Sequence, residues 1–214
     1  MSILSSILSF ILHIDTHLAE IVAQYGALTY GILFTIVFAE TGFIVTPFLP
    51  GDSLLFAIGA LSALGSFNLW ISLVLLMAAA ILGDTVNYWI GHFFGQKIVD
   101  NPKIPFINQS HIDKTQEFYK KHGGKTIILA RFVPIVRTFA PFVAGIGKMD
   151  YSQFILYNIV GGVAWVSSFT LLGFFFGNLP AVKENFTLVV LGIVAMSVVP
   201  MVWEFVKEKR SHKT

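Results

Sequence analysis

Five ionisable residues lie within strongly apolar stretches of this sequence: Glu40, Asp52, Asp84, Arg131 and Arg137. If these stretches are membrane segments, each such residue costs about 2.5–3.5 kcal/mol at a helix centre. The five must therefore be paired, hydrated or placed near an interface. Because ionisable groups in membranes usually line pathways, we favour a functional role over ion pairs that serve only helix packing.

Two of these residues, Arg131 and Arg137, flank a proline, Pro134. On an unbroken helix, residues six apart point about 120° away from each other, so the two guanidiniums would diverge. A helix break at Pro134 would let both turn toward one cavity. A planar guanidinium matches the oxygens of phosphate or carboxylate, and amides freed at the break would help to hold an anion. We therefore predict that both arginines bind an anionic headgroup.

The acidic counterpart is the segment from Glu40 to Asp52. The backbone between and beside these acids contains residues that interrupt helices: Pro47, Pro50 and Gly51. A buried carboxyl group favours its neutral form and a neighbouring guanidinium favours the carboxylate, so acids placed here could exchange protons near neutral pH. We predict that Glu40 and Asp52 couple transport to protons. For Asp52 the alternative is a structural N-cap of a helix that begins at Ser53.

A third polar cluster is expected to support the first two. Asp84, Asn87, Tyr88 and Gly91 share one helical face, which we expect to point inward. The pairs Gly91/Gly95 and Gly173/Gly177 have the spacing of close helix–helix contacts. Two further residues are assigned a supporting role because they interrupt the apolar run that carries the arginines: Pro134 and Pro141.

The sequence gives little support for a metal site, a cofactor or an enzymatic activity. The six histidines show no metal-ligand spacing, and the absence of cysteine excludes thiolate metal sites and a cysteine nucleophile. The sequence has no HExxH, GxSxG or P-loop motif, and no histidine accompanies the arginines as a lipid phosphatase would require. We therefore expect no metal, no cofactor and no enzymatic activity.

The amino-acid composition indicates that the chain folds in a membrane. Of 214 residues, 55% are hydrophobic and 12% are charged, with a mean hydropathy of +0.75, as is typical of an integral membrane protein. The net charge of +2 comes largely from lysines in one loop and the C-terminal tail, which indicates membrane topology rather than a nucleic-acid partner.

The apolar pattern predicts an all-α fold with about four transmembrane helices and two broken, re-entrant hairpins. Residues 27–206 form a single transmembrane domain between an amphipathic N-terminal helix and a basic tail. The predicted elements are an amphipathic helix at 1–26, a helix at 28–46, a broken hairpin at 47–65, a helix at 67–94, an aqueous loop with a short helix at 97–126, a broken segment at 127–147 cut by Pro134 and Pro141, helices at 151–177 and 186–205, and a tail at 207–214.

Lysine bias then predicts the orientation. If positive loops lie inside, the 97–126 loop, the tail and both termini are cytoplasmic. The two broken segments would enter from opposite faces, and they could form an inverted repeat of the kind found in transporters.

Together these residues resemble the bacterial DedA family, whose domain is shared with the VTT, or SNARE-associated Golgi, group of lipid scramblases. The residues that carry the resemblance are Glu40, the segment from Pro47 to Asp52, Gly83, Asp84, Tyr88, Gly91, Arg131, Pro134, Arg137, Pro141 and Gly145. The resemblance implies a multi-pass protein of the bacterial cytoplasmic membrane, needed for envelope integrity and dependent on proton motive force. It implies two facing re-entrant elements, with Glu40, Asp52, Arg131 and Arg137 as functional residues.

The resemblance also implies a substrate class, polyprenyl phosphate, and in particular the undecaprenyl carrier that returns to the inner leaflet. Membrane lipids, this lipid phosphate and protons are thus the expected partners, with a homodimer also considered. Three alternatives stay open: a proton-coupled exporter of small cations, a phospholipid scramblase, and an envelope-assembly factor that transports nothing.

Overall fold

The structure is a computed structural model that describes residues 26–43, 51–99, 109–180 and 182. Within these ranges the chain forms helices and turns and no strand. The predicted amphipathic helix at 1–26, the predicted helix at 186–205, the tail, Pro47 and Pro50 lie outside the described residues.

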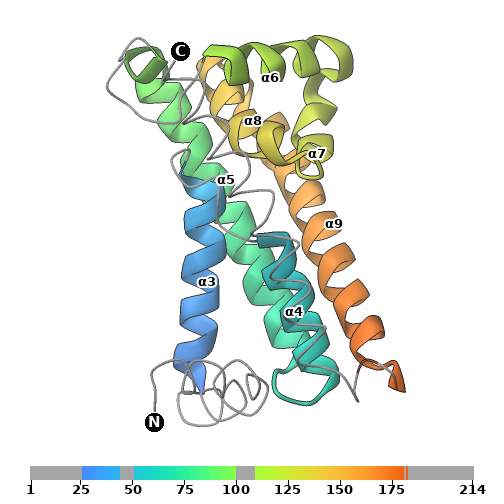
Figure 1. Ribbon diagram of the computed structural model, residues 1–214. Coiled ribbons are helices and arrows are strands. Elements are labelled where there is room, and N and C mark those ends of the chain that lie inside the picture. The colour runs from blue at the N-terminus through green and yellow to red at the C-terminus, as the bar shows by residue number, and fades with distance from the viewer. Residues whose placement is uncertain (1–25, 44–50, 100–108, 181, 183–214) are drawn as a thin grey trace, which may run out of the picture. The chain divides into compact units, whose positions relative to one another are not determined.

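Figure 1 shows the described helices, with their labels. In chain order they are α3 (Ala27–Gly42), α4 (Gly51–Ala63), α5 (Leu69–Val99), α6 (Gln109–His122), the 3-10 turn η1 (Gly123–Lys125), α7 (Thr126–Ala130), α8 (Pro134–Ile146) and α9 (Tyr151–Gly177).

Two helices are long and apolar enough to cross a bilayer. Leu69–Gly95 of α5 and Tyr151–Gly177 of α9 each contain 27 residues, with mean hydropathies of 2.1 and 1.8 over their most apolar windows. A hydrocarbon core of about 30 Å needs roughly 20 residues. Both helices agree with the predicted helices at 67–94 and 151–177.

The chain divides into two compact units, and three of the four boundaries between them fall within α3, α5 and α9. Unit 1 comprises Met1–Gly31, Pro50–Ser72 and Phe169–Thr214, and unit 2 comprises Ile32–Leu49 and Leu73–Ser168.

Within unit 1, α4 packs closely against the end of α9. A Cβ atom added at Gly173 would meet the backbone of Phe56, and one added at Gly177 would lie 2.8 Å from the Cα of Ala60. These contacts confirm the predicted role of the Gly173/Gly177 pair in helix packing.

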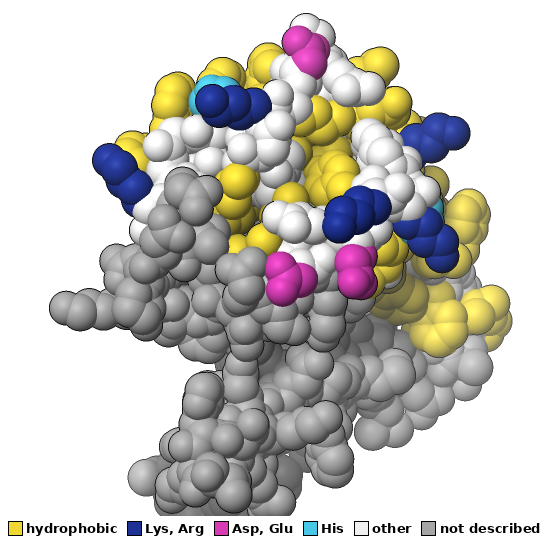
Figure 2. All heavy atoms as spheres, turned by 90° about the horizontal axis from the view of Figure 1, so that it is seen from above, with side chains coloured by type: hydrophobic (Ala, Val, Ile, Leu, Met, Phe, Trp, Pro, Cys, Tyr) yellow, Lys and Arg dark blue, Asp and Glu magenta, His cyan; other side chains and the backbone are white. Residues whose placement is uncertain are grey.

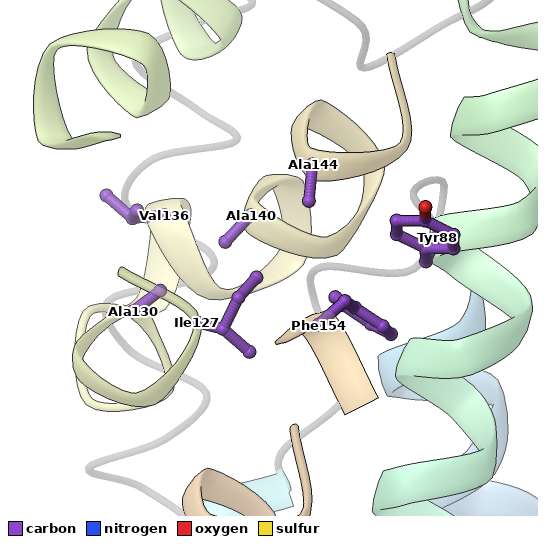
Figure 3. Packing of buried hydrophobic residues seen from close by; sticks show 7 residues of the cluster. All are labelled: Tyr88, Ile127, Ala130, Val136, Ala140, Ala144 and Phe154. Atoms are coloured by element: carbon purple, nitrogen blue, oxygen red, sulfur yellow. The ribbon is translucent and has the colours of Figure 1, made fainter. Parts of the chain in front are cut away.

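The core of unit 2 is built where α7 and α8 meet α5 and α9. Figure 3 shows its buried members: Tyr88, Ile127, Ala130, Val136, Ala140, Ala144 and Phe154. The rings of Tyr88 and Phe154 stack with centroids 4.4 Å apart. A Cβ atom added at Gly91 would collide with the backbone of Phe142, so the absence of a side chain lets α5 approach α8.

The predicted break beside Pro134 is confirmed, because α7 ends at Ala130 and α8 begins at Pro134. Val133 is extended, as expected for the residue before a proline, and Pro134 occupies the first turn of α8. The break predicted at Pro141 is wrong, since α8 continues through that residue. Pro141 removes one helical hydrogen bond, the one that the carbonyl of Arg137 would otherwise accept, and helices packed in a membrane tolerate such a loss. The carbonyl of Thr138, one residue further along α8, accepts a hydrogen bond from the Asn87 amide at 2.9 Å.

The predicted loop contains the expected short helix. α6 lies beside α8, with Ile112 buried and Lys120 and Lys121 exposed (Figure 1). Tyr119 donates a hydrogen bond to the carbonyl of Ala140 at 2.9 Å, and burial raises the pKa of the Tyr119 phenol above its usual range. Figure 2 shows basic and acidic side chains around an apolar middle, without a continuous patch of one sign.

Candidate functional site

The break between α7 and α8 positions two acid–arginine pairs in unit 2, one partly buried and one fully buried. Nη2 of Arg137 donates to Oε1 of Glu40 at 2.9 Å, and the side chains are 11% and 3% exposed. Glu40 lies in the last turn of α3 and Arg137 in the first turn of α8. A negative charge at the end of a helix and a positive charge at the start of one are both unfavourable with respect to the helix dipole. The attraction between Glu40 and Arg137 must therefore stabilise the two charged side chains.

The second pair is more deeply buried. Nη2 of Arg131, whose residue is 2% exposed, donates to Oδ2 of Asp84 and to Oδ1 of Asn158, both at 2.6 Å. Asp84 lies in the middle of α5 and is 3% exposed. Asn158 on α9 also donates to the carbonyl of Ile81 at 3.0 Å, so α9 fixes the geometry of this pair.

Nε and Nη1 of Arg131 have no hydrogen-bond partner among the described residues, although both atoms are buried. Buried donors are normally satisfied, and leaving them unpaired costs about 1–3 kcal/mol, more for charged groups. The guanidinium therefore retains the capacity to bind an oxygen ligand beyond the carboxylate of Asp84.

Trp165 of α9 links the two pairs. Cζ of Arg131 lies 5.8 Å from the centroid of its ring and Cζ of Arg137 lies 5.1 Å away. Both arginines thus contact one aromatic ring, and that they face one cavity and bind an anion stays a prediction.

Asn87, predicted as a supporting residue, is fully buried and joins two helices of the site. Its amide nitrogen donates to the carbonyl of Thr41 at 3.1 Å, at the end of α3, and to that of Thr138 in α8. This contact places the helix that carries Glu40 beside the helix that carries Arg137. Asp84, Asn87, Tyr88 and Gly91 are all buried, which confirms the predicted inward face.

Asp52 belongs to unit 1, whereas the paired charges belong to unit 2. The alternative role of Asp52 as the N-cap of a helix that begins at Ser53 is wrong. The helix begins at Gly51, so Asp52 lies inside its first turn. An acid there still interacts favourably with the helix dipole. Gly51 is buried at the start of this helix.

Asn158, Trp165 and the glycines beside them were not singled out from the sequence. A Cβ atom added at Gly161 would lie 3.2 Å from Nε of Arg131, so this glycine leaves room for the guanidinium. The available signal was periodicity, because Asn158 and Trp165 are seven residues apart in an apolar span and therefore share a helical face.

A separate cavity of about 390 Å³ lies in unit 2, and none of the predicted site residues lines it. Its walls are formed by Gln116, Tyr119, Gly123, Gly124, Val143, Ala144, Ile146, Gly147, Met149 and Gln153. Among the described residues, no group of three or more His, Asp or Glu side chains has the arrangement of a metal site.

The described part of the chain thus defines a helical protein with membrane-length helices and buried, paired charges. The profile of the VTT domain matches residues 49–175. Protein DedA of Escherichia coli K12 is 54% identical over 213 residues, which cover 99% of this chain and 97% of that protein.

Two further relatives are membrane proteins by name. An uncharacterized membrane protein of Mycobacterium tuberculosis H37Rv is 44% identical over 82% of this chain and 77% of its own length. Inner membrane protein YqjA of Escherichia coli K12 is 33% identical over 71% of this chain and 69% of its own length. No solved structure matches the chain. The chain belongs to the DedA family of membrane proteins.

Proposed function

We propose that this protein is a transporter, driven by the proton motive force, that moves a lipid phosphate, undecaprenyl phosphate in particular, across the bacterial inner membrane. The observation that carries the proposal is the buried Arg131 guanidinium, which has unsatisfied donors and shares the ring of Trp165 with the partly buried Arg137. Phosphate oxygens are suitable ligands for paired guanidinium groups. The proposed activity requires no covalent step, metal or cofactor.

In the proposed mechanism the headgroup takes the place of the Glu40 carboxylate on Arg137 and joins Asp84 on Arg131. Phosphate oxygens accept hydrogen bonds from Nε and Nη1 of Arg131, and the Arg137–Glu40 pair opens to provide the second guanidinium. A buried carboxylate that loses its cationic partner favours its neutral form, so Glu40 takes up a proton when the headgroup binds. Anion binding and proton binding are then reciprocally linked, as any two coupled sites must be.

Asp52 is proposed as a second proton-coupling acid in the N-terminal turn of α4. This assignment rests on the resemblance to the DedA family, which the segment from Pro47 to Asp52 carries in part. We propose that the two broken segments are re-entrant, and the break between α7 and α8 supports this for the second of them.

Binding measured against pH tests the coupling. The affinity for polyprenyl sulfate, whose own charge is constant near neutral pH, is measured for wild type, Glu40→Gln and Asp52→Asn. Glu117→Gln is the matched control, because it makes the same change at an exposed position of α6. We expect wild type and the control to share one pH dependence and Glu40→Gln to bind with little pH dependence. Identical profiles in all variants would show that the two acids are structural.

The proposed topology has both termini and the 97–126 loop in the cytoplasm. Because the chain lacks cysteine, single cysteines at Lys114 and Ser211 can be labelled without background. An impermeant reagent applied to intact cells should leave both unlabelled. External labelling of either position would overturn this topology.

A further inference from the structure

Trp165 is the side chain that both arginines of the site contact. Its ring lies 5.8 Å from Cζ of Arg131 and 5.1 Å from Cζ of Arg137. Within about 6 Å the face of an aromatic ring attracts a guanidinium, and tryptophan does so most strongly. Trp165 is fully buried, so water weakens these attractions little.

The acids cannot keep the two guanidiniums together during transport. Glu40 holds Arg137 and Asp84 holds Arg131, so each arginine is fixed by a different helix. Two guanidiniums beside one ring also repel each other. If phosphate displaces Glu40 from Arg137, the two ion pairs no longer fix the spacing of the arginines. The ring attracts both cations whichever anion they bind.

We propose that Trp165 is a positioning residue that holds the guanidiniums of Arg131 and Arg137 close together while Arg137 exchanges the Glu40 carboxylate for phosphate oxygens. This inference rests on the proposed function and extends it to specificity. A phosphomonoester headgroup presents three terminal oxygens and up to two charges, whereas a phosphodiester presents two oxygens and one charge. Two guanidiniums held together therefore favour the monoester.

The test compares Trp165→Leu and Trp165→Phe with wild type. The matched control is Trp70→Leu, because Trp70 of α5 is 73% exposed. Binding of polyprenyl phosphate, a monoester, and phosphatidylglycerol, a diester, is titrated against purified full-length protein in detergent. We expect Trp165→Leu to weaken monoester binding about tenfold and diester binding much less. Trp165→Phe, which keeps an aromatic face, should lie between Trp165→Leu and wild type, and the control should match wild type.

A merely structural role for Trp165 predicts a different result. Loss of folded protein lowers the amount of lipid bound at saturation but leaves the ratio of monoester to diester affinity unchanged. If Trp165→Leu retains the wild-type ratio of monoester to diester affinity, the positioning role is wrong. If the leucine variant does not fold, the same criterion applies to Trp165→Phe.

A second measurement does not depend on any substrate. The chain has four tryptophans, so replacing Trp70, Trp89 and Trp203 by phenylalanine leaves Trp165 as the sole indole emitter. We expect Arg137→Leu to shift the emission of Trp165 in this protein without added lipid. An unchanged emission would overturn the contact and the positioning role with it. If wild type binds neither lipid while the emission shifts, the proposed function fails but the contact of Trp165 with Arg137 stands.

Discussion

Arg137 and Glu40 are 97 residues apart in the chain, yet their side chains form a largely buried ion pair with an N–O distance of 2.9 Å. The pair joins the end of α3 to the start of α8, immediately after the break that also positions Arg131. Breaking such a pair by removing one partner is strongly destabilising, whereas a ligand that replaces the partner is not. This difference is the physical basis for treating the pair as an exchangeable anion site.

The planar shape of the guanidinium is predicted to be essential at both arginines. Arg131→Lys and Arg137→Lys keep the positive charge but replace a fork of five donors by a single ammonium group. We expect each variant to fail to complement a strain that lacks the protein, while remaining in the membrane at the wild-type level. Full complementation by both lysine variants would show that bidentate binding is not required.

Asp84 is predicted to be the counter-charge that permits burial of Arg131. Asp84→Asn keeps the size of the side chain and removes its charge, so we expect a loss of about 3–5 kcal/mol in unfolding free energy. Removing both charges in Asp84→Asn/Arg131→Met should restore part of that loss, because no uncompensated charge then remains buried. The free energies come from reversible unfolding in mixed micelles. A double variant less stable than Asp84→Asn alone would contradict the assignment.

Close packing of α5 on α8 is predicted to depend on Gly91. In Gly91→Ala the added methyl group collides with the backbone of Phe142, and we expect a loss of about 1–3 kcal/mol in stability. Gly31→Ala on α3 is the control, since a Cβ atom there meets nothing within 4 Å. Alanine is the better helix former by up to about 1 kcal/mol, so the control should be neutral or slightly more stable. Equal effects of the two substitutions would refute the contact.

Tyr119 is predicted to make stability depend on pH in the alkaline range. Burial raises the pKa of its phenol in the folded protein, whereas the unfolded chain has a value near 10. Above that value the unfolded state loses its proton first, so stability should be unaffected below about pH 10 and should fall as the pH rises further. Thermal unfolding of Tyr119→Phe should show a weaker alkaline decline, together with a loss of about 1 kcal/mol at neutral pH from the missing hydrogen bond to Ala140. If wild type and Tyr119→Phe lose stability equally at alkaline pH, a group other than Tyr119 causes the loss.

The sequence predicted the elements whose causes are local. The helices at 67–94 and 151–177 follow from apolar runs of membrane length, and the break before Pro134 follows from the missing amide hydrogen and the steric demand of proline. The same rule failed at Pro141, where α8 continues through a proline. A local rule weighs only the one lost hydrogen bond, whereas a helix packed in a membrane can tolerate it.

The partners within the site could not be predicted. Nothing in the sequence states that Glu40 pairs with Arg137 or Asp84 with Arg131, because these pairs form only when α3 packs near α8 and α5 packs near the end of α7. Asn158 and Trp165 were missed because an amide or an indole in an apolar span commonly serves packing alone. Their roles become visible from the distances of 2.6 Å and 5.1 Å that join them to the arginines.

Transport itself is tested most directly in liposomes. The purified protein is reconstituted with labelled polyprenyl phosphate, and the exposure of the label to an impermeant reagent is followed with and without a pH gradient. Arg137→Lys and a labelled phosphatidylglycerol are run in parallel. We predict that wild type redistributes the polyprenyl phosphate between leaflets faster when the gradient is present, that Arg137→Lys does not, and that phosphatidylglycerol moves little. Equal movement of both lipids without dependence on the gradient would contradict the account and indicate scrambling. No movement of either lipid would also contradict it, and would leave an exporter of cations or an assembly factor.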